Sequence, residues 1–399
     1  MTTVTTCCVV GGGPAGMVLG YLLARAGIAV TVLEKHGGFL RDFRGDTIHP
    51  STAQLMDELG LGTAFGRLPI RTVDTVHLVT DDGTYAIADF SRIPGPHRLG
   101  FLPQWDFLNF LTEQAERYPG FDLRMRAEAV DVVRHGTRIA GVLVRDTDGE
   151  LSELHADLIV AADGRDSTIR AAVDLPIVEH GAPIDVLWFR VSKHDDDPES
   201  AFGRLTRGHF MVMIDRGDYW QAGYLIVKGE HEHLRAEGID EFRRRVADVA
   251  PFLSDRLDEI SSWDDAPLLS VQVNRLRRWW RPGLLCIGDA AHAMSPVAGV
   301  GINLAVQDAV AAARILAGPL RTGRVSPWHL ARVQVRRTLP TAVTQRVQRL
   351  AQDRVISPVI HGEAGGRTPL VIRALDRVPA LRTVPAFAIG HGVLPEHVP

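Results

Sequence analysis

The chain has 399 residues, of which 45% are hydrophobic and 23% are charged. This length suits two or three domains, and the composition is that of a folded globular protein, which excludes a small disulfide scaffold and a mainly disordered chain. With 44 basic and 48 acidic residues the formal net charge is −4. No overall positive field points to nucleic acid, so we expect a small-molecule function and no nucleic-acid partner.

The cysteines and the apolar N-terminal stretch indicate where in the cell the protein is expected to be located. Cys7, Cys8 and Cys286 cannot form a disulfide framework and show no metal-ligand spacing. The stretch from Cys7 to Ala24 is uncharged, but no Lys or Arg precedes it, and Gly11-Gly12-Gly13-Pro14 interrupts it. We therefore expect no integral membrane segment, no metal site and a reduced cytoplasmic protein.

The pattern of the first part of the sequence predicts, in chain order, a strand, a glycine turn, a helix and a second strand, which together form a βαβ unit. Two helices entered by proline follow, with a hairpin around Asp82-Gly83 between them. Short strands then lead through a turn at Asp148-Gly149 into a buried strand. The corresponding ranges are 7–10, 14–26, 29–33, 50–59, 72–90, 103–118 and 122–160.

The second half of the chain predicts a different sheet. Three apolar, β-rich segments at 186–191, 209–214 and 219–227 predict an antiparallel arrangement, with residues 215–218 as the loop between the last two. We then expect helices and one more buried strand, with the last helix bent at Pro340. Their ranges are 240–249 and 254–260 for two helices, 284–287 for the strand, and 301–316 and 326–355 for two further helices.

A G-x-G-x-x-G motif follows the first predicted strand and opens the first helix, at Gly11, Gly13 and Gly16. The first glycine permits a tight turn, the second lets the backbone approach a pyrophosphate, and the third lets helix and strand pack closely. Glu34 ends the second strand, near the spacing of the carboxylate that binds a ribose in this motif. A plain glycine turn and a solvated surface glutamate are the alternative interpretation.

Two later strands also end in an acidic residue, Asp163 before Gly164 and Asp289 after Gly288. Ligands of open α/β sheets bind at such carboxyl ends. Beyond Asp289, the segment from Gly299 to Asn303 opens a helix, whose free N–H groups and dipole favour a negative charge. Asn303 can equally be an ordinary helix cap.

With these three motifs in this order, the sequence resembles the group A flavoprotein monooxygenases, the aromatic hydroxylases of the p-hydroxybenzoate hydroxylase fold. The resemblance extends from Val9 to near Leu316. It implies non-covalent FAD, NAD(P)H as a transient co-substrate, O₂, and hydroxylation of an aromatic or related small molecule through a flavin C4a-hydroperoxide. Two alternatives stay open, namely an FAD-dependent reductase or dehydrogenase of the same fold and a non-catalytic flavin-binding protein.

The resemblance also implies the architecture. We expect an α/β protein with a Rossmann-like FAD-binding domain on a parallel sheet, an interleaved antiparallel substrate domain, and C-terminal helices. The expected boundaries are 1–71, 97–180 and 276–320 for the FAD-binding domain, 72–96 and 181–275 for the substrate domain, and 321–399 for the C-terminal helical segment.

The residues that match the family's motifs are expected to bind the cofactor. Glu34 would hold the adenosine ribose, and Asp289 would accept a ribityl hydroxyl. Arg44 would lie by the FAD phosphates or ribose, Gln104 by the ribityl chain, and Val130 would offer backbone to the adenine. Asp163 is linked in the family to both FAD and the reduced pyridine nucleotide. The complete expected set is Gly11, Gly13, Pro14, Ala15, Gly16, Glu34, Lys35, Arg44, Gln104, Val130, Asp163, Asp289, Pro296, Gly299, Gly301, Ile302 and Asn303.

No side chain is a certain catalytic group, because the flavin carries the chemistry; Pro296 is expected near the flavin. One departure from the family is Ala298, which stands where glycine is usual and constrains the backbone there. His292 is expected to have a structural role. The segment His231-Glu232-His233 is expected to be a solvated loop. The W-x-W-x-I-P string of flavin-dependent halogenases is absent.

A substrate pocket is expected on one face of the antiparallel sheet. With residues 215–218 as a four-residue loop, Ile214 would face Tyr219, Val212 would face Gln221, and Phe210 would face Gly223. Apolar walls, one amide and space at a glycine suit a planar aromatic substrate. The expected substrate contacts are Phe210, Val212, Gln221 and Gly223, and the alternative is that this face is ordinary core. The oligomeric state stays open.

Overall fold

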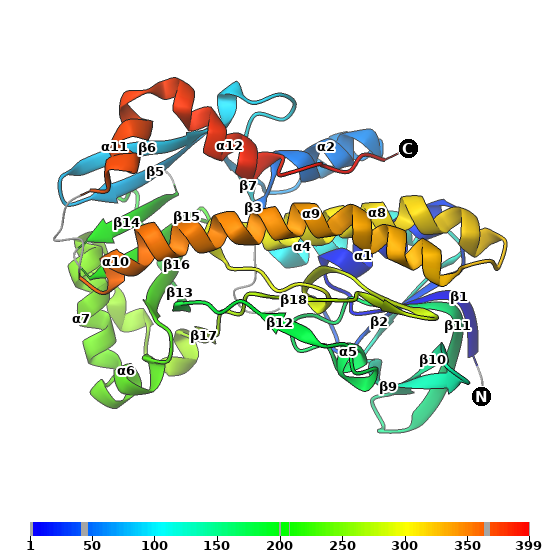
Figure 1. Cartoon of the computed structure of the whole chain (residues 1–399). Coiled ribbons are helices and arrows are strands. Elements are labelled where there is room, and N and C mark those ends of the chain that lie inside the picture. The colour runs from blue at the N-terminus through cyan, green and yellow to red at the C-terminus, as the bar shows by residue number, and fades with distance from the viewer. Residues whose placement is uncertain (1–2, 41–46, 199–200, 207, 363–367, 399) are drawn as a thin grey trace.

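The computed structural model describes residues 3–40, 47–198, 201–206, 208–362 and 368–398. Within them, two large sheets lie at opposite ends of a layer of long helices (Figure 1). One is an eight-stranded sheet built mainly from the N-terminal half, and the other is a seven-stranded sheet built mainly from residues 184–269.

The eight-stranded sheet has a parallel centre. β1 (Thr3–Val10) lies between β2 (Val30–Glu34) and β11 (Leu151–Ala161), and the parallel order continues to β8 (Phe121–Met125) on one side and β20 (Leu284–Cys286) on the other. Every residue of β2 is buried, as expected for parallel strands covered on both faces. Antiparallel strands complete the edges: β9 (Glu128–His135), β10 (Arg138–Arg145) and β19 (Trp280–Arg281). The predicted βαβ opening is confirmed.

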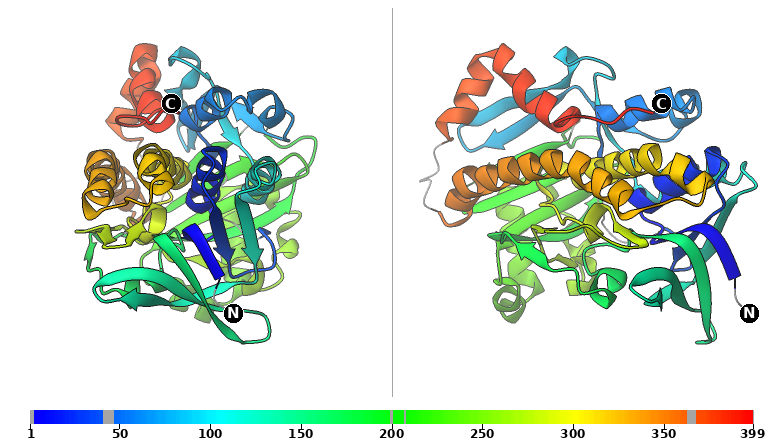
Figure 2. Two further views of the ribbon diagram at one scale, coloured as in Figure 1. Left: turned by 90° about the vertical axis from the view of Figure 1, so that its right-hand side faces the viewer. Right: turned by 45° about the vertical axis from the view of Figure 1, so that its right-hand side comes forward.

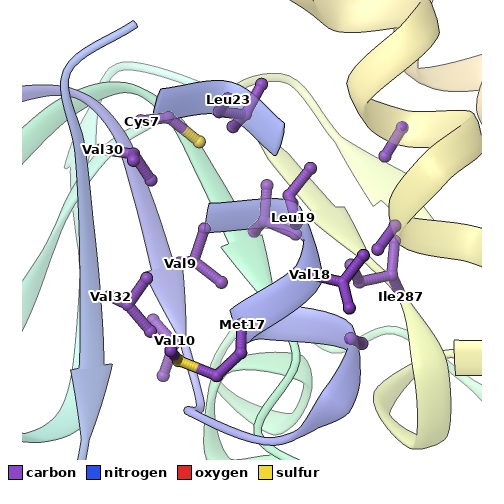
Figure 3. Packing of buried hydrophobic residues seen from close by; sticks show 14 of the residues in the cluster. Cys7, Val9, Val10, Met17, Val18, Leu19, Leu23, Val30, Val32 and Ile287 are labelled. Carbon is purple, nitrogen blue, oxygen red and sulfur yellow. The ribbon is translucent and has the colours of Figure 1, made fainter. Parts of the chain in front are cut away.

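Four helices lie side by side on this sheet in the order α9, α8, α1, α4 (Figure 2). Side chains of α1, including Met17, Leu19 and Leu23, pack on the valines of β1 and β2 (Figure 3). The segment Val297–Arg321 is long and apolar enough to cross a membrane, but 78% of its most apolar window is buried in the protein, which is the behaviour of a core helix. The bounds are Pro14–Arg25 for α1, Gln104–Ala115 for α4, Gly301–Arg321 for α8 and Pro327–Ala351 for α9.

The seven-stranded sheet is mixed, where an antiparallel sheet was predicted. Its order is β17 (Leu268–Leu269), β13 (Ile184–Ser192), β16 (Tyr219–Val227), β15 (His209–Asp215), β14 (Phe202–Thr206), β5 (Thr75–Thr80) and β6 (Gly83–Asp89). All neighbours pair antiparallel except β14 and β5, which are parallel because the hairpin β5–β6 joins the edge from a distant part of the chain. The domain boundaries themselves stay a prediction.

One face of this sheet is closed by α6 (His231–Glu237) and α7 (Ile239–Val249), with Met211, Met213, Trp220 and Tyr224 in the shared core. His231 therefore starts a helix, and the predicted loop is wrong. The opposite face is open to a cavity. At its edge, α11 (Leu370–Arg377) and α12 (Thr383–Gly390) pack against β6 (Figure 1).

Shorter elements connect these layers. Two small sheets pair β3 (Thr47–Ile48) and β4 (Arg71–Val73) with β7 (Leu99–Phe101), and β12 (Ile177–Glu179) with β18 (Asn274–Leu276). The remaining helices are α2 (Pro50–Glu58), α3 (Gly62–Phe65), α5 (Thr168–Ala172) and α10 (Ser357–Ile360). The helix predicted over 326–355 runs through Pro340, and a wider turn, Gln352–Ile356, leads from α9 into α10.

The predicted register of β15 and β16 is wrong by two residues. Ile214 pairs with Gln221, Val212 with Gly223 and Phe210 with Leu225. β15 extends one residue further than predicted, to Asp215, and a tight turn closes the hairpin at Gly217, whose φ is +101°. Because side chains alternate with a period of two, a shift of two leaves every residue on its predicted face.

No α-helix forms over 254–260; residues 254–256 form a turn between two short 3₁₀ helices, Pro251–Leu253 and Leu257–Glu259. Arg256, which lies in this turn, donates to Asp197 at 2.8 and 3.2 Å, and Trp220 Nε1 donates to the same carboxylate at 2.8 Å. Both charged residues are 7% exposed. The ion pair thus replaces helical geometry as the organising contact of this segment.

We expect Arg256→Met to lower the free energy of unfolding by about 3–5 kcal/mol, because it leaves the Asp197 carboxylate buried and unpaired. Burial raises the pKa of Asp197, but its hydrogen bonds and Arg256 outweigh that and hold the pKa below its ordinary value. The stabilisation is therefore present above the unfolded-state pKa of about 3.9 and is lost as the pH falls through the lower folded-state pKa.

Urea unfolding at several pH values measures this effect. The control is Arg145→Met, which removes an exposed pair with Glu128 and should cost less than about 1 kcal/mol. Equal losses in the two variants at neutral pH would contradict the account.

Candidate cofactor and substrate site

A cavity of about 990 Å³ joins the carboxyl ends of the parallel strands to the open face of the seven-stranded sheet. This volume is at the upper end of the ~300–1,000 Å³ range of small-molecule sites. Its lining comes from the loops after β1, β2 and β11, the turn at Asp289, the start of α8, one face of β13, β15 and β16, and the C-terminal helices.

The three glycines of the N-terminal motif have different surroundings. Gly11 has φ +106°, and a Cβ there would lie 2.3 Å from the carbonyl oxygen of Ala162. A Cβ on Gly16 would lie 1.9 Å from the carbonyl oxygen of Gly11. At Gly13, which lines the cavity, nothing lies within 4 Å of that position. Two glycines thus permit close backbone packing, and the third leaves open backbone facing the cavity beside Pro14 and Ala15.

Glu34 links this loop to the end of β2. Its carboxylate is 3% exposed and lines the cavity. Gly12 N–H donates to Oε2 at 3.0 Å, His36 N–H donates to Oε1 at 3.0 Å, and the His36 ring nitrogen Nδ1 lies 2.7 Å from the same oxygen. The solvated glutamate of the alternative interpretation is therefore excluded, while Lys35 beside it also lines the cavity and is exposed.

The two other acidic turns reach the same cavity. Asp163 accepts hydrogen bonds from Ser167 Oγ at 2.5 Å and Ile169 N–H at 3.1 Å, so it organises the start of α5; burial raises its pKa. Asp289 lies in the next turn, with Arg165 Nη2 at 3.6 Å from its carboxylate. Because the parallel strands end at one edge of the sheet, Glu34, Asp163 and Asp289 line the same cavity.

The start of α8 forms the remaining cofactor wall, with Pro296, Gly299, Gly301 and Ile302 in the lining. Val300 caps α8 without a side-chain hydrogen bond, so the first N–H groups of a long helix are available to an anion. Ala298 has φ +63° and Gly299 has φ +62°, which places the alanine that departs from the family in a left-handed conformation.

These surroundings fit FAD. The backbone is open at Gly13, Gly164 and Gly301, where nothing lies within 4 Å of an added Cβ, so phosphate and ring atoms can approach closely. Carboxylates at two strand ends suit ribose and ribityl hydroxyls, and the N-terminus of α8 suits a negatively charged ring edge. Gln104, at the start of α4, also lines the cavity.

Three of the described residues expected to bind the cofactor, Gly16, Val130 and Asn303, are not in the cavity lining. Gly16 is inside α1, and Val130 is not in the cavity lining, whereas its neighbour Ala129 is. Asn303 accepts hydrogen bonds from Ser51 Oγ at 2.8 Å and Thr52 Oγ1 at 3.0 Å, so its side chain connects α8 to α2. Arg44 lies outside the described residues.

All four expected substrate residues line the cavity, namely Phe210, Val212, Gln221 and Gly223. The expected space at Gly223 is wrong, because a Cβ there would meet the Trp188 ring at 3.1 Å. Gln221 is 4% exposed, and its Oε1 accepts a hydrogen bond from Arg216 Nε at 3.0 Å. That bond sets the orientation of the amide at the cavity wall.

Sequence reasoning missed several contributors. His49 is fully buried, with Nδ1 at 2.8 Å from the Ile389 carbonyl and Nε2 at 3.1 Å from the Gly299 carbonyl; burial lowers its pKa. Side chains of α11 and α12 also line the cavity, among them Ile372, Leu375 and Ile389. The two His49 contacts join parts of the chain 340 and 250 residues apart, and no local pattern signals them.

We expect Glu34→Ala and Asp289→Ala each to weaken FAD binding, because each removes a charge-assisted hydrogen bond worth ~1.5–3 kcal/mol, roughly ten- to hundredfold in Kd. Titration of the apoprotein with FAD measures the effect, and Glu153→Ala, on an exposed part of β11, is the control. Unchanged Kd values in both site variants would overturn the cofactor assignment.

A second pair of variants tests the turn before α8. Gly299→Ala should reduce FAD retention, because its Cβ would lie 2.4 Å from Thr47 Oγ1 at a positive φ. Ala298→Gly removes a strained alanine at a comparable φ and should retain FAD fully. Flavin absorbance per protein after gel filtration measures both, and equal retention would show that the turn does not shape the cofactor wall.

Similarity to known proteins extends over the part of the chain that contains the cofactor loops. A family model described as FAD binding domain matches residues 4–347. The 6-methylpretetramide 4-monooxygenase of Streptomyces rimosus is 33% identical over 387 residues, which cover 95% of this chain and 91% of that protein. The 3-demethoxyubiquinol 3-hydroxylase of Escherichia coli is 25% identical and is matched over 87% of its length by 86% of this chain.

Solved structures share the fold. OxyS, an anhydrotetracycline hydroxylase from Streptomyces rimosus, matches with a TM-score of 0.77 at 22% identity, over 100% of this chain and 77% of its own. PqsL of P. aeruginosa, solved with 2-aminobenzoylacetate, matches with a TM-score of 0.75 at 20% identity, over 91% and 99%. Together with the family match and the geometry of the cavity, these findings show that the chain belongs to the FAD binding domain family, among its FAD-dependent aromatic monooxygenases.

Proposed function

We propose that this monooxygenase hydroxylates a polycyclic aromatic small molecule of the polyketide type, with NAD(P)H as reductant and O₂ as oxygen donor. The observation that carries the proposal is the shared cavity, in which the cofactor loops and the open face of the seven-stranded sheet line one space. The substrate class is supported by the 33% identical relative, whose name specifies a pretetramide, and by the apolar character of the sheet face.

When bound, FAD supplies the redox chemistry that activates O₂, and the chain's own residues bind, orient and exclude water. The glycine loop and Glu34 would hold the adenosine diphosphate part, and Asp289 would hold the ribityl chain. The N-terminus of α8, with Gly301 and Ile302 in the wall, would stabilise negative charge on the ring. Pro296 and the turn at Ala298 and Gly299 would form this end of the cavity.

The sheet face would orient the substrate. Phe210, Val212, Ile214 and Leu225 provide apolar walls, and Trp188 covers Gly223 and narrows the space above it. Gln221 provides an amide in fixed orientation through Arg216. A flat, largely apolar molecule with few hydrogen-bonding groups suits this wall.

NAD(P)H is proposed to dock transiently near Asp163, without a Rossmann fold of its own. The chain has one G-x-G-x-x-G that follows a strand and opens a helix, and FAD would occupy it. Exposed residues such as Asp166, Thr168 and Ser270 line the cavity on this side, so the cavity opens to solvent there. Substrate-stimulated reduction of FAD should follow from such weak docking.

A cytoplasmic location is also proposed. It is supported by three free, buried cysteines, of which Cys8 has its pKa raised to about 12 by burial, and by the burial of the apolar segment in α8.

Turnover with a panel of phenols, quinones and polyketide-derived aromatics tests the function. We expect yellow protein that releases FAD on denaturation, NAD(P)H oxidation that one class stimulates, and an oxygenated product by mass spectrometry. NAD(P)H oxidation with a reduced, unoxygenated product would indicate the reductase alternative. Bound FAD with no turnover on any compound would indicate the non-catalytic alternative.

We expect Gln221→Leu to raise KM or to divert reducing equivalents to hydrogen peroxide, because a misplaced substrate loses roughly tenfold or more in productive encounters. Product formed per NAD(P)H consumed measures the diversion. Met211→Leu is the matched control, since Met211 is on the neighbouring strand and faces the closed core. Wild-type KM and product yield in folded Gln221→Leu would place the substrate elsewhere.

A further inference from the structure

A cluster of buried charges lies behind the cofactor wall, outside the cavity lining. Asp308 of α8 is 0% exposed, and His292, Arg337 of α9 and Glu396 of the C-terminal tail are each 1% exposed. Charged groups buried this deeply need partners, because their desolvation costs several kcal/mol each. The function described above uses none of the four.

Asp308 connects the cluster to the cofactor turn. Its Oδ2 accepts hydrogen bonds from Gly288 N–H at 3.0 Å and from His292 Nε2 at 2.6 Å, and its Oδ1 accepts one from Arg337 Nε at 2.9 Å. Burial pushes the pKa of Asp308 up, but His292 and Arg337 outweigh it and hold the pKa below its ordinary value. The carboxylate is therefore ionised when it holds the Gly288 N–H.

Gly288 is the residue that aims Asp289 into the cavity. Its φ is +58°, and a Cβ there would lie 3.1 Å from the Cβ of Ala15, in the first turn of α1 directly after the glycine loop. Asp289 follows directly and lines the cavity. The hydrogen bond from Gly288 to Asp308 thus fixes the turn that carries Asp289 against the nucleotide loop.

The C-terminal tail contacts the same cluster from the other side. The Glu396 carboxylate lies 2.5 Å from Arg336 Nε, 2.7 Å from Arg314 Nη2 and 3.5 Å from Arg337 Nη1. Its backbone N–H donates to Gln307 Oε1, the residue before Asp308. Arg337 therefore lies between two carboxylates: it donates a hydrogen bond to Asp308 of α8, and Glu396 attracts it across 3.5 Å without a hydrogen bond.

We propose that Glu396 is a positioning residue for FAD, which acts through Arg337 and Asp308 to hold the Gly288–Asp289 turn, so that the C-terminal tail sets the affinity for the cofactor. The proposal rests on the assignment of Asp289 to FAD. With Glu396 in place the guanidinium of Arg337 is held between the two carboxylates, and without Glu396 one of these two restraints is lost.

The test compares FAD affinities of apoprotein variants. Glu396→Gln and Asp308→Asn should each raise the Kd for FAD roughly 3- to 30-fold, the range of couplings carried by packed polar networks. The double variant should raise it by less than the product of the two, because both act through Arg337. The matched control is Glu58→Gln, which weakens the His397 and Val398 contacts of the same tail; among the described residues, Glu58 makes no hydrogen bond or ion pair with the Asp308 cluster.

Glu58→Gln should raise the Kd for FAD much less than Glu396→Gln does, because the contacts of Glu396 itself with Arg314 and Arg336 remain. If Glu396→Gln does not fold, Arg336→Gln tests the same step, because it removes the nearest cation of Glu396 from a partly exposed position. Arg336→Gln should also raise the Kd for FAD, but by less than Glu396→Gln.

A reciprocal readout separates positioning from general stability. If the tail favours FAD, then FAD favours the docked tail by the same factor, so saturation with FAD should slow trimming of the tail by a carboxypeptidase in wild type and less in Asp308→Asn. Unchanged Kd in Glu396→Gln, an equal effect of Glu58→Gln, or multiplicative Glu396 and Asp308 effects would each overturn the proposal. If Asp289→Ala also leaves the Kd unchanged, the assignment of Asp289 to FAD fails instead.

Discussion

The close approach of two neighbouring strand ends is the constraint on which the site depends. β1 and β11 run parallel and end at the same edge of the sheet, where the carbonyl oxygen of Ala162 lies against Gly11. Any side chain at Gly11 would push these ends apart, and Gly16 has the same relation to the turn itself. The compact edge leaves room for Glu34, Asp163 and Asp289 to share one cavity, and the seven-stranded sheet then closes its other side.

Much of this site is readable from local patterns. Strand, glycine turn and helix at residues 7–26, and an acidic residue after each of two later buried strands, predict a dinucleotide cavity because parallel strands end together. The faces of β15 and β16 are also readable, since alternation survives a register shift of two. The register itself was wrong because the strand continues to Asp215, and turn length depends on where pairing stops rather than on composition.

What could not be predicted depends on contacts between distant parts of the chain. Trp188 fills the space at Gly223 from a neighbouring strand, and the Asn303 side chain accepts hydrogen bonds from Ser51 and Thr52 of α2. The helix expected at 254–260 gives way to turns because Arg256 must reach the buried Asp197. The same holds for the parallel pairing of β14 with β5 and for the C-terminal helices that line the cavity. In both cases distant segments meet, and the sequence of one segment does not identify the other.

The fold does not select the reaction, since solved structures of the same architecture include a halogenase and a Diels–Alderase. Oxygen transfer requires that the substrate binds on the open face of the seven-stranded sheet while FAD binds in the adjoining part of the same cavity. The most direct measurement is turnover of an accepted polycyclic aromatic under ¹⁸O₂ in ordinary water, with mass analysis of the product. The account predicts one labelled oxygen atom in each product molecule, whereas unlabelled product, or consumption of NAD(P)H that yields only labelled hydrogen peroxide, would contradict it.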